Sequence, residues 1–420
     1  MTEKLLQYIW QFQYYNPSGL STSQEEPLTI IHPGTHNTNQ GPDFLNGKIK
    51  VGNTTWAGSI EVHVNSSEWK THGHSSDPNY DNVILHVVWK HDSPDTIFPF
   101  PTLELQNRIP NMLLSRYEEL MQSSSFISCE KHIASVPQLT IQAWKERMLV
   151  ERLQEKTGVV ESFLKENKGN WEEVLWWMLA RNFGTKINGD VFEAIARSVP
   201  LNVLSRNKFQ LHTIEALLFG QSWMLDKKFT EAYPQMLQKE YRYFQKKYSL
   251  KKIHLPLFFL RMRPANFPTI RLAQLAMLVA QHQRLFAAIK ELEKLSQVRE
   301  LLNVPANDYW HYHYMFDEPS AFKIKNTGAQ MIDNILINTI IPVLFAYGHL
   351  AGHEASKIKA LKWIEETGAE KNKVTHGFEC LGIGNKNASD SQALLYMKKN
   401  YCDRKGCVEC AIGNKILKNV

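Results

Sequence analysis

Residues 41–63, GPDFLNGKIKVGNTTWAGSIEVH, decide the fold of the N-terminal part of the chain. Apolar and polar residues alternate strictly from Ser59 to Asn65, which is the two-residue period of a β-strand. Upstream, lysines alternate with apolar residues from Lys48 to Val51, and Gly52-Asn53 between the two runs is a turn signal. The stretch therefore predicts a β-hairpin that begins with Pro-Asp and ends with Glu-x-His.

The polar face of this hairpin offers candidate metal ligands. Glu61 and His63 project from one face of the second strand, and Asp43 begins the first strand. Two neighbouring carboxylates can hold Mg²⁺ or Mn²⁺. The cation polarises a phosphoryl oxygen and lowers the pKa of a bound water, which a histidine can position or activate. We interpret Asp43 and Glu61 as metal ligands and all three as catalytic residues; a half-buried strand with an exposed Glu and His is the alternative.

The geometry of the hairpin sets a condition on this site. With a two-residue turn at Gly52-Asn53, regular pairing places Asp43 opposite Val62 and so on the face away from Glu61. A three-residue loop or one β-bulge returns Asp43 to the face of Glu61. We therefore expect such an irregularity in the hairpin.

The segments on either side of the hairpin supply auxiliary residues. Glu3 lies at the start of an expected amphipathic helix, where it either adds a ligand or only favours the helix dipole. After the hairpin, His72-x-His74 followed by Asp77 has the spacing of metal ligands, in a loop rich in Ser, Gly, Pro and Asn. A polar surface loop is the alternative for that segment.

Length and periodicity give the class of the whole chain. With 420 residues, 43% hydrophobic and 21% charged, it is typical of a soluble globular protein of two or three domains. About five strands are expected early, with His86 as a core residue of a buried strand, and helical periodicity takes over from Thr140. The predicted class is α+β, divided into an α+β mixed-sheet domain over 1–135, a helical domain over 136–305, and an aromatic linker with a helical, cysteine-rich segment over 306–420.

Pro42-Asp43 followed by Glu61-x-His63 resembles the PD-(D/E)xK nuclease core, with His63 in the place of the lysine of the motif. The lysine is a fixed cation, whereas histidine titrates near neutrality and also binds metals. The resemblance implies a restriction-endonuclease-like N-terminal domain. In some members of that class, a further acid comes from the first helix, as Glu3 would here, and a four-cysteine cluster lies outside the catalytic core.

Essentially the whole chain also resembles an uncharacterised bacterial family, domain of unknown function 2851. The resemblance implies no activity. It rests on IIHPGTHNTNQGPDF (30–44), WAGSIEVHVNSSEW (56–69), HGHSSDPNYDNVILHVVW (72–89), RPANFPTIRLAQLA (263–276) and YCDRKGCVECAIGN (401–414).

Four of the five cysteines lie near the end of the chain. Cys402-x4-Cys407-x2-Cys410, with Cys380 upstream, offers the four thiolates that tetrahedral Zn²⁺ or a 4Fe-4S cluster needs. Reduced thiols at a helix terminus are the alternative. Cys129 is interpreted as an isolated thiol.

Charge is divided unevenly along the chain. Residues 1–130 carry 7 Lys+Arg against 14 Asp+Glu, and the remainder carries 41 against 28. An acidic domain with metal ligands joined to a basic body suits nucleic acid, although ordinary variation between domains explains the charges equally well. The aromatic run 308–316 either stacks on bases or packs domains together. The candidate nucleic-acid contacts are Arg242, Lys246, Lys247, Arg263 and Arg271.

Three functions remain open at this point. The first is a divalent-metal-dependent phosphodiester hydrolase, nuclease-like and acting on nucleic acid. The second is a non-catalytic nucleic-acid-binding or scaffold protein. The third is a metalloenzyme of another class that uses His63, His72 and His74 on a transition metal. The apolar run 335–344 is too short for a bilayer, and no signal-peptide pattern is present, so we expect a cytoplasmic protein without a membrane partner.

Overall fold

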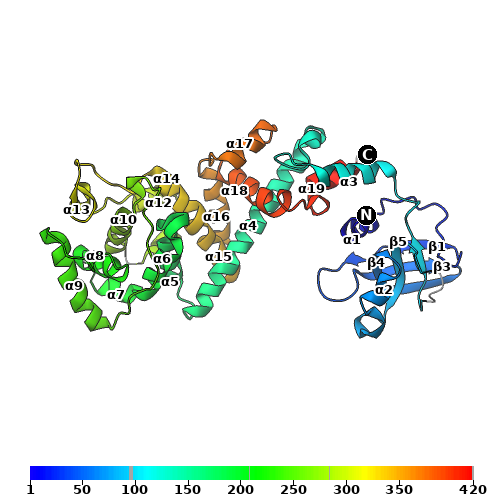
Figure 1. Ribbon diagram of the computed structural model, residues 1–420, viewed down its shortest axis with the longest axis horizontal. Helices are drawn as coiled ribbons and strands as arrows, with labels where there is room; N and C mark the ends of the chain where they lie inside the picture. The colour runs from blue at the N-terminus through cyan, green and yellow to red at the C-terminus, as the bar shows by residue number, and fades with distance from the viewer. Residues whose placement is uncertain (94–97, 208, 283, 419–420) are drawn as a thin grey trace. The chain divides into compact units, whose positions relative to one another are not determined.

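The computed structural model describes residues 1–420 except 94–97, 208, 283 and 419–420 (Figure 1). The chain forms two compact units, whereas the sequence suggested three consecutive domains. The cysteine-rich end belongs to the first unit. The units comprise Met1–Lys145, Gly377–Ile383 and Leu395–Val420 in the first, and Glu146–His376 and Gly384–Leu394 in the second.

A mixed sheet forms the centre of the first unit and confirms the α+β class. Its strand order is β1-β3-β4-β5-β6, with β2 paired to β3. The β1/β3 and β3/β4 pairs are antiparallel, whereas β4/β5 and β5/β6 are parallel, so β4 lies in the middle. The strands are β1 (Leu28–His32), β2 (Thr35–His36), β3 (Phe44–Val51), β4 (Thr54–Asn65), β5 (Val83–Lys90) and β6 (Thr102–Glu104).

The β3–β4 hairpin has the predicted two-residue turn and an irregular register further along. Gly47 pairs with Gly58 but Phe44 pairs with Ile60, so β3 contains one residue more than β4 between these pairs. The extra residue makes a β-bulge. Asn46 within it has φ of 60°, a left-handed conformation that Asn adopts more readily than most residues. The irregularity expected from the sequence is confirmed.

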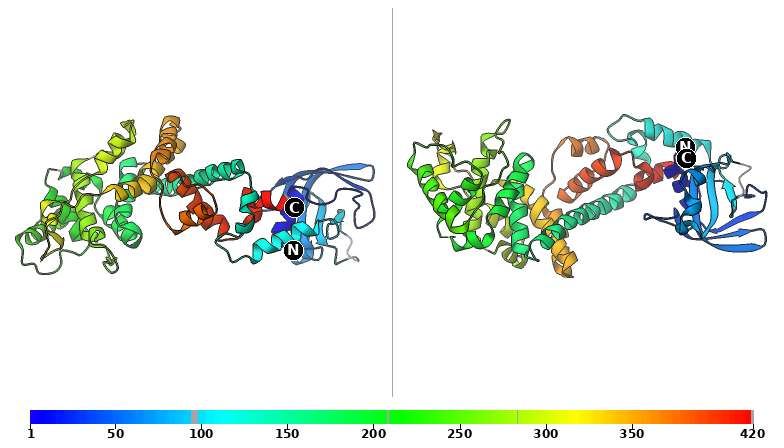
Figure 2. Two further views of the ribbon diagram at one scale, coloured as in Figure 1. Left: turned by 90° about the horizontal axis from the view of Figure 1, so that it is seen from above. Right: turned by 60° about the horizontal axis from the view of Figure 1, so that its bottom comes forward.

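Two short helices of the first unit, α1 and α2, pack against β4 (Figure 2). The Thr2 hydroxyl caps α1 by accepting the N–H of Leu5 at 3.3 Å, and the apolar side of the helix is buried. The helices of this unit are α1 (Glu3–Gln11), α2 (Glu68–Thr71), η1 (His74–Ser76), η2 (Pro78–Tyr80), α3 (Asn111–Gln122), η3 (Glu130–Ser135), η6 (Lys398–Cys402), η7 (Cys407–Glu409) and α19 (Ala411–Lys418).

Three helices contribute residues to both units: α4 (Gln138–Glu166), α17 (Lys373–Cys380) and α18 (Ala388–Met397). The second unit is otherwise helical, with one two-stranded sheet. Its elements are α5 (Trp171–Phe183), α6 (Thr185–Ser198), α7 (Leu201–Arg206), α8 (Leu211–Gln221), α9 (Ala232–Tyr248), η4 (Pro264–Asn266), α10 (Pro268–Gln281), α11 (Leu285–Glu291), α12 (Leu295–Leu302), α13 (Asp308–His311), β7 (His313–Met315), β8 (Glu318–Pro319), α14 (Ala329–Ile335), η5 (Leu336–Ile340), α15 (Ile341–Leu350) and α16 (Glu354–Glu366).

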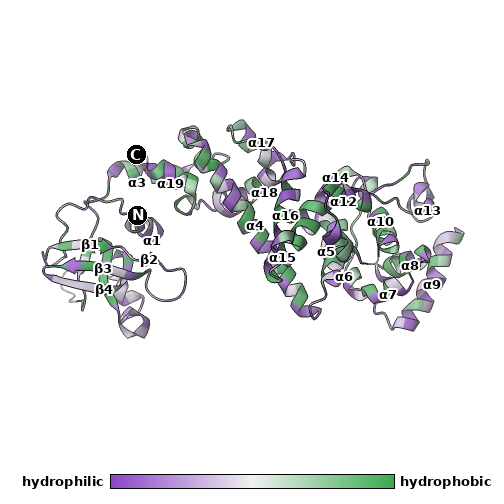
Figure 3. Ribbon diagram, turned by 180° about the vertical axis from the view of Figure 1, so that it is seen from behind, coloured by the Kyte–Doolittle hydropathy of each residue, from purple (hydrophilic) through white to green (hydrophobic). Residues whose placement is uncertain are grey.

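Trp310 and Phe316 of the aromatic run belong to the core of the second unit. Trp310 is completely buried, with its ring 5.1 Å from that of Phe219 and 4.8 Å from that of Phe316. The run therefore packs within this unit. Among the described residues, one helix, Ala329–Leu350, is long and apolar enough to cross a membrane, but 72% of its apolar window is buried, as in the core helix of a soluble protein. Figure 3 shows the hydrophobic residues on α15, its last part.

Candidate metal centre

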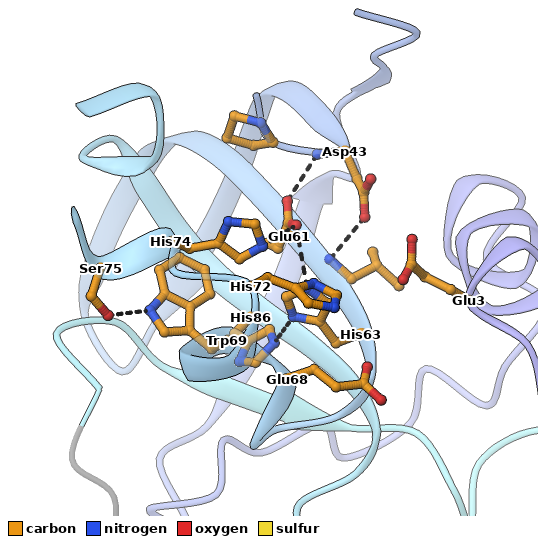
Figure 4. A network of polar contacts seen from close by, with 12 residues as sticks. Glu3, Asp43, Glu61, His63, Glu68, Trp69, His72, His74, Ser75 and His86 are labelled. Atoms are coloured by element: carbon orange, nitrogen blue, oxygen red, sulfur yellow. Dashed lines mark hydrogen bonds and ion pairs between the residues drawn. The ribbon is translucent and has the colours of Figure 1, made fainter. Parts of the chain in front are cut away.

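The bulge brings the two predicted acids onto one face of the sheet. Because Phe44 pairs with Ile60, Asp43 comes opposite Glu61. The backbone N–H of Asp43 donates to Glu61 Oε2 at 3.0 Å (Figure 4). The N–H of Val62 donates to Asp43 Oδ2 at 3.2 Å. Each carboxylate is thus fixed by the backbone of the other strand.

Helix α1 adds a third acid. Residues 3 and 7 are one helical turn apart and share a face. Gln7 Nε2 lies 3.1 Å from Glu3 Oε1 and 2.9 Å from Asp43 Oδ1, so this amide joins the two carboxylates. Glu3 therefore lies beside the centre, as the nuclease resemblance implied.

Three histidines converge on the same point. His63 Nε2 is 3.2 Å from His72 Nδ1 and 3.5 Å from Glu61 Oε1. His74 Nε2 is also 3.5 Å from Glu61 Oε1, and it is buried without a hydrogen-bond partner. One ring nitrogen from each histidine lies within 4.8 Å of the others. His63 is buried and His72 is exposed, so the centre opens to solvent at His72.

The loop after β4 is held in place by packing and by hydrogen bonds. Glu68 accepts the N–H of Val64 at 3.1 Å, which fixes the start of α2 against the strand end. Trp69 is buried, and its indole N–H donates to Ser75 Oγ at 3.0 Å. The ring of Tyr80 stacks on that of His74 with centroids 3.9 Å apart. These contacts orient the histidine loop toward the sheet.

The electrostatic state of the centre favours a bound cation. Burial, followed by the charge of Asp43, raises the pKa of Glu61 to about 8. Burial raises the pKa of Asp43 to about 6 against the effect of the Gln7 hydrogen bond. Burial, followed by the neighbouring histidines, lowers the pKa of His63 to about 3. A pKa of about 8 means that Glu61 holds a proton at pH 7, whereas the His63 imidazole is neutral with a free lone pair. A metal ion at this point would bind the imidazole and displace the proton of Glu61, because metal ligands must be deprotonated.

The spacings fit a single metal ion. Two ligand atoms about 2.1 Å from one ion lie about 3.0 to 3.4 Å apart, depending on the coordination angle. The separations of His63 Nε2 from His72 Nδ1 and from Glu61 Oε1 are 3.2 and 3.5 Å, and that of His74 Nε2 from Glu61 Oε1 is 3.5 Å. These four side chains can hold one ion, with Asp43 and Glu3 on its acidic side.

His86, which we expected to be a plain core residue, supports the centre. It is completely buried on β5, and its Nε2 lies 2.9 Å from His63 Nδ1. Burial lowers the pKa of His86 to about 2. This contact fixes the ring of His63 and directs Nε2 toward the other ligands. The signal in the sequence was a lone histidine inside the apolar run after the Glu-x-His strand.

Two other residues that the sequence suggested as site residues, Asp77 and Arg271, are bound within the fold. Asp77 Oδ1 accepts two hydrogen bonds from Asn79 at the start of η2, so this carboxylate is a helix cap. Arg271 is only 8% exposed, and its guanidinium donates to Gln274 and Asn266. The expectation that Arg271 contacts nucleic acid is wrong, because α10 is buried on nearly all sides. The remaining basic candidates, Arg242, Lys246, Lys247 and Arg263, are exposed.

The fold and this centre define a mixed-sheet protein with a candidate metal site of imidazoles and carboxylates. The chain belongs to the family described as protein of unknown function (DUF2851), whose model matches residues 3–373. The match includes every residue of the candidate centre. Neither a curated protein nor a solved structure matches the chain.

Proposed function

We propose that the protein is a divalent-metal-dependent phosphodiester hydrolase that acts on nucleic acid, with its ion held by Glu61, His63, His72 and His74. The observation that carries the proposal is the convergence of three imidazoles and one carboxylate oxygen at the spacings of metal ligands. The buried, unpartnered Nε2 of the half-buried His74 supports it, because a buried polar atom without a partner is costly unless a ligand satisfies it.

The ligand set favours a transition metal. Imidazole nitrogens suit Fe²⁺ and Zn²⁺, whereas Mg²⁺ takes oxygen ligands in a nearly ideal octahedron. Of the two ions expected from the sequence, we take Mn²⁺ as the better fit because it is the transition metal of the pair. His63 also changes its expected role, since one nitrogen contacts His86 and the other faces the ligand set. It acts as a ligand and not as the base that activates water.

The substrate class rests on the placement of the acids. Asp43 and Glu61 come from adjacent antiparallel strands, and Glu3 comes from the first helix, as the PD-(D/E)xK pattern implies. A bound ion would polarise a phosphoryl oxygen and lower the pKa of its water. In the hydrolysis an oxygen from water would form the new bond to phosphorus, the bond to the leaving oxygen would break, and the water proton would end on that leaving oxygen. The backbone N–H of Asp43 holds Glu61 Oε2, which leaves Oε1 for the ion.

The experiment compares activity and metal content in the full chain. The purified protein is assayed with Mn²⁺, Zn²⁺ and Mg²⁺ on linear DNA, on RNA and on a small aryl phosphodiester. We expect cleavage with Mn²⁺, a loss of about 100-fold or more in Glu61→Gln and His72→Ala, and no change in His349→Ala, an exposed histidine of the second unit. Equal activity in all variants, or none with any ion, would contradict the proposal.

A second candidate is a metalloenzyme of another class, which the three imidazoles favour by themselves. It predicts tight binding of Zn²⁺ or Fe²⁺ at the same residues without cleavage of any phosphodiester. Loss of the bound ion in His72→Ala together with an inactive wild type would select it. A scaffold protein predicts neither binding nor cleavage. For the cellular location, our proposal is the cytoplasm.

A further inference from the structure

A second cluster of ligating side chains lies in the first unit around η7. One pocket is lined by four cysteines, Cys129, Cys402, Cys407 and Cys410, together with Ser128, Tyr401, Gly406 and Gly413. Cys129 comes from the turn before η3, far from the other three in sequence. The interpretation of Cys129 as an isolated thiol is therefore wrong. Cys380, which we had placed in the set, is exposed and does not line this pocket.

We propose that Cys129, Cys402, Cys407 and Cys410 bind an iron–sulfur cluster. Four cysteines in one pocket supply the complete set of thiolates that such a cluster takes. Three of them are nearly buried, each 8% exposed, and Cys402 is half-buried. The pocket lining contains no carboxylate or imidazole, so sulfur is the ligand it offers, and soft thiolates select zinc, Cu(I) or iron–sulfur clusters.

The surroundings of the sulfurs suit thiolates that are bound to metal. The backbone N–H groups of Ile412 and Gly413, in the first turn of α19, donate to Cys410. The Ser128 side chain hydrogen-bonds to Cys407. Hydrogen bonds of this kind to coordinating sulfur set the properties of iron–sulfur centres. Burial, followed by the nearby sulfurs, raises the pKa of Cys129 to about 12, so without a cation the site holds neutral thiols.

The spacing of the cysteines along the sequence favours an iron–sulfur cluster over a single zinc ion. Cys402-x4-Cys407-x2-Cys410 is a spacing found in iron–sulfur proteins, where the fourth cysteine comes from a distant part of the chain. Cys129 has that position here, because it lines the same pocket from far away in the sequence. A single zinc ion held by four thiolates is the competing occupant that the metal analysis tests.

The test uses the full chain purified without oxygen. Iron, acid-labile sulfide and zinc are measured per chain, and Mössbauer spectroscopy of the wild type gives the cluster type without any variant. We expect about two or about four iron ions with matching sulfide, and visible charge-transfer absorption. Cys129→Ser should lower the iron content at least tenfold. Cys380→Ser is the matched control and should keep wild-type iron.

Three results would overturn the proposal: one zinc ion per chain in place of iron, iron that survives Cys129→Ser, or iron lost in Cys380→Ser. If Cys129→Ser does not fold, Cys129→His keeps a ligand at that position, and the wild-type analysis still decides between iron and zinc. None of these measurements depends on hydrolase activity, so they remain decisive if the proposed function fails.

Discussion

The two units each bury a glutamate, and the difference between these two sites separates structure from function. Glu215 in α8 is completely buried, and it accepts hydrogen bonds from Tyr233, from Asn307 at 3.3 Å and from Trp310 at 3.0 Å. Glu61 is nearly as buried, but its Oε1 faces two imidazole nitrogens at 3.5 Å, and one of them, Nε2 of His74, is buried without a hydrogen-bond partner. The hydrogen-bond network of Glu215 is satisfied by protein donors and stabilises the core. The network around Glu61 leaves a buried nitrogen without a partner, which is the state in which a bound ligand stabilises the site.

The largest expected effect tests the satisfied network. Trp310→Ala removes a completely buried ring that donates to Glu215 and packs on Phe219 and Phe316. Loss of a buried Trp costs about 3 to 5 kcal/mol. We expect the free energy of unfolding of the second unit to fall by this amount in denaturant titrations, with metal binding by the first unit unchanged. Tyr312→Ala, at an exposed aromatic, is the control.

The next effect is a pH dependence that belongs to Glu215. Burial raises the pKa of Glu215 from 4.5 to about 7. Since the folded state holds this proton more tightly than the unfolded state, the stability is fully present below pH 4.5 and is lost as the pH rises through about 7. This difference in pKa corresponds to a change of about 3 kcal/mol in the free energy of unfolding over that pH range.

Glu215→Gln replaces the carboxyl with an isosteric amide that does not titrate. We expect denaturant titrations between pH 4.5 and 7 to show a flatter dependence in this variant than in the wild type. A slope equal to that of the wild type would mean that other groups cause the dependence.

The comparison becomes sharper when the same substitution is made at the other glutamate. Glu61→Gln removes the charged ligand from the candidate centre, and we expect affinity for Mn²⁺ or Zn²⁺ to fall about 100-fold, or about 2.7 kcal/mol. Isothermal titration calorimetry measures this, and Glu215→Gln serves as the matched control. Equal losses in the two variants would show that the two glutamates are equivalent and would break the comparison.

The smallest expected effect concerns a residue that acts through another. His86→Phe keeps an aromatic ring in β5 but removes the contact with His63 Nδ1. Loss of an outer partner of a metal-ligating histidine costs about 10-fold to 100-fold in affinity, and we expect the lower end because Trp69 also packs against His63. Calorimetry with the same ions measures it, and an unchanged affinity would assign His86 to the core alone.

Local pattern was sufficient to predict the hairpin and its acids. Strand alternation placed Glu61 and His63 on one face of the sheet. With a two-residue turn, Asp43 reaches that face only if the hairpin contains a β-bulge, and the structure has this bulge at Asn46. Arg271 was predicted wrongly because the charge of the residue was weighed above the apolar character of its helix. Cys129 shares a pocket with the terminal cysteines only because of the path that the chain takes over most of its length. A pattern of neighbouring residues in the sequence therefore could not predict this proximity.

Residues 409 and 414 lie against the first helix although about 400 positions of sequence separate them from it. Lys4 Nζ is 3.0 Å from Glu409 Oε1, and the Tyr8 hydroxyl donates to the carbonyl of Asn414 at 3.4 Å. The same helix holds Asp43 through Gln7. Helix α1 therefore connects the cysteine-rich segment mechanically to the acidic side of the candidate centre, and a change that loosens η7 or α19 can reach Asp43 through it.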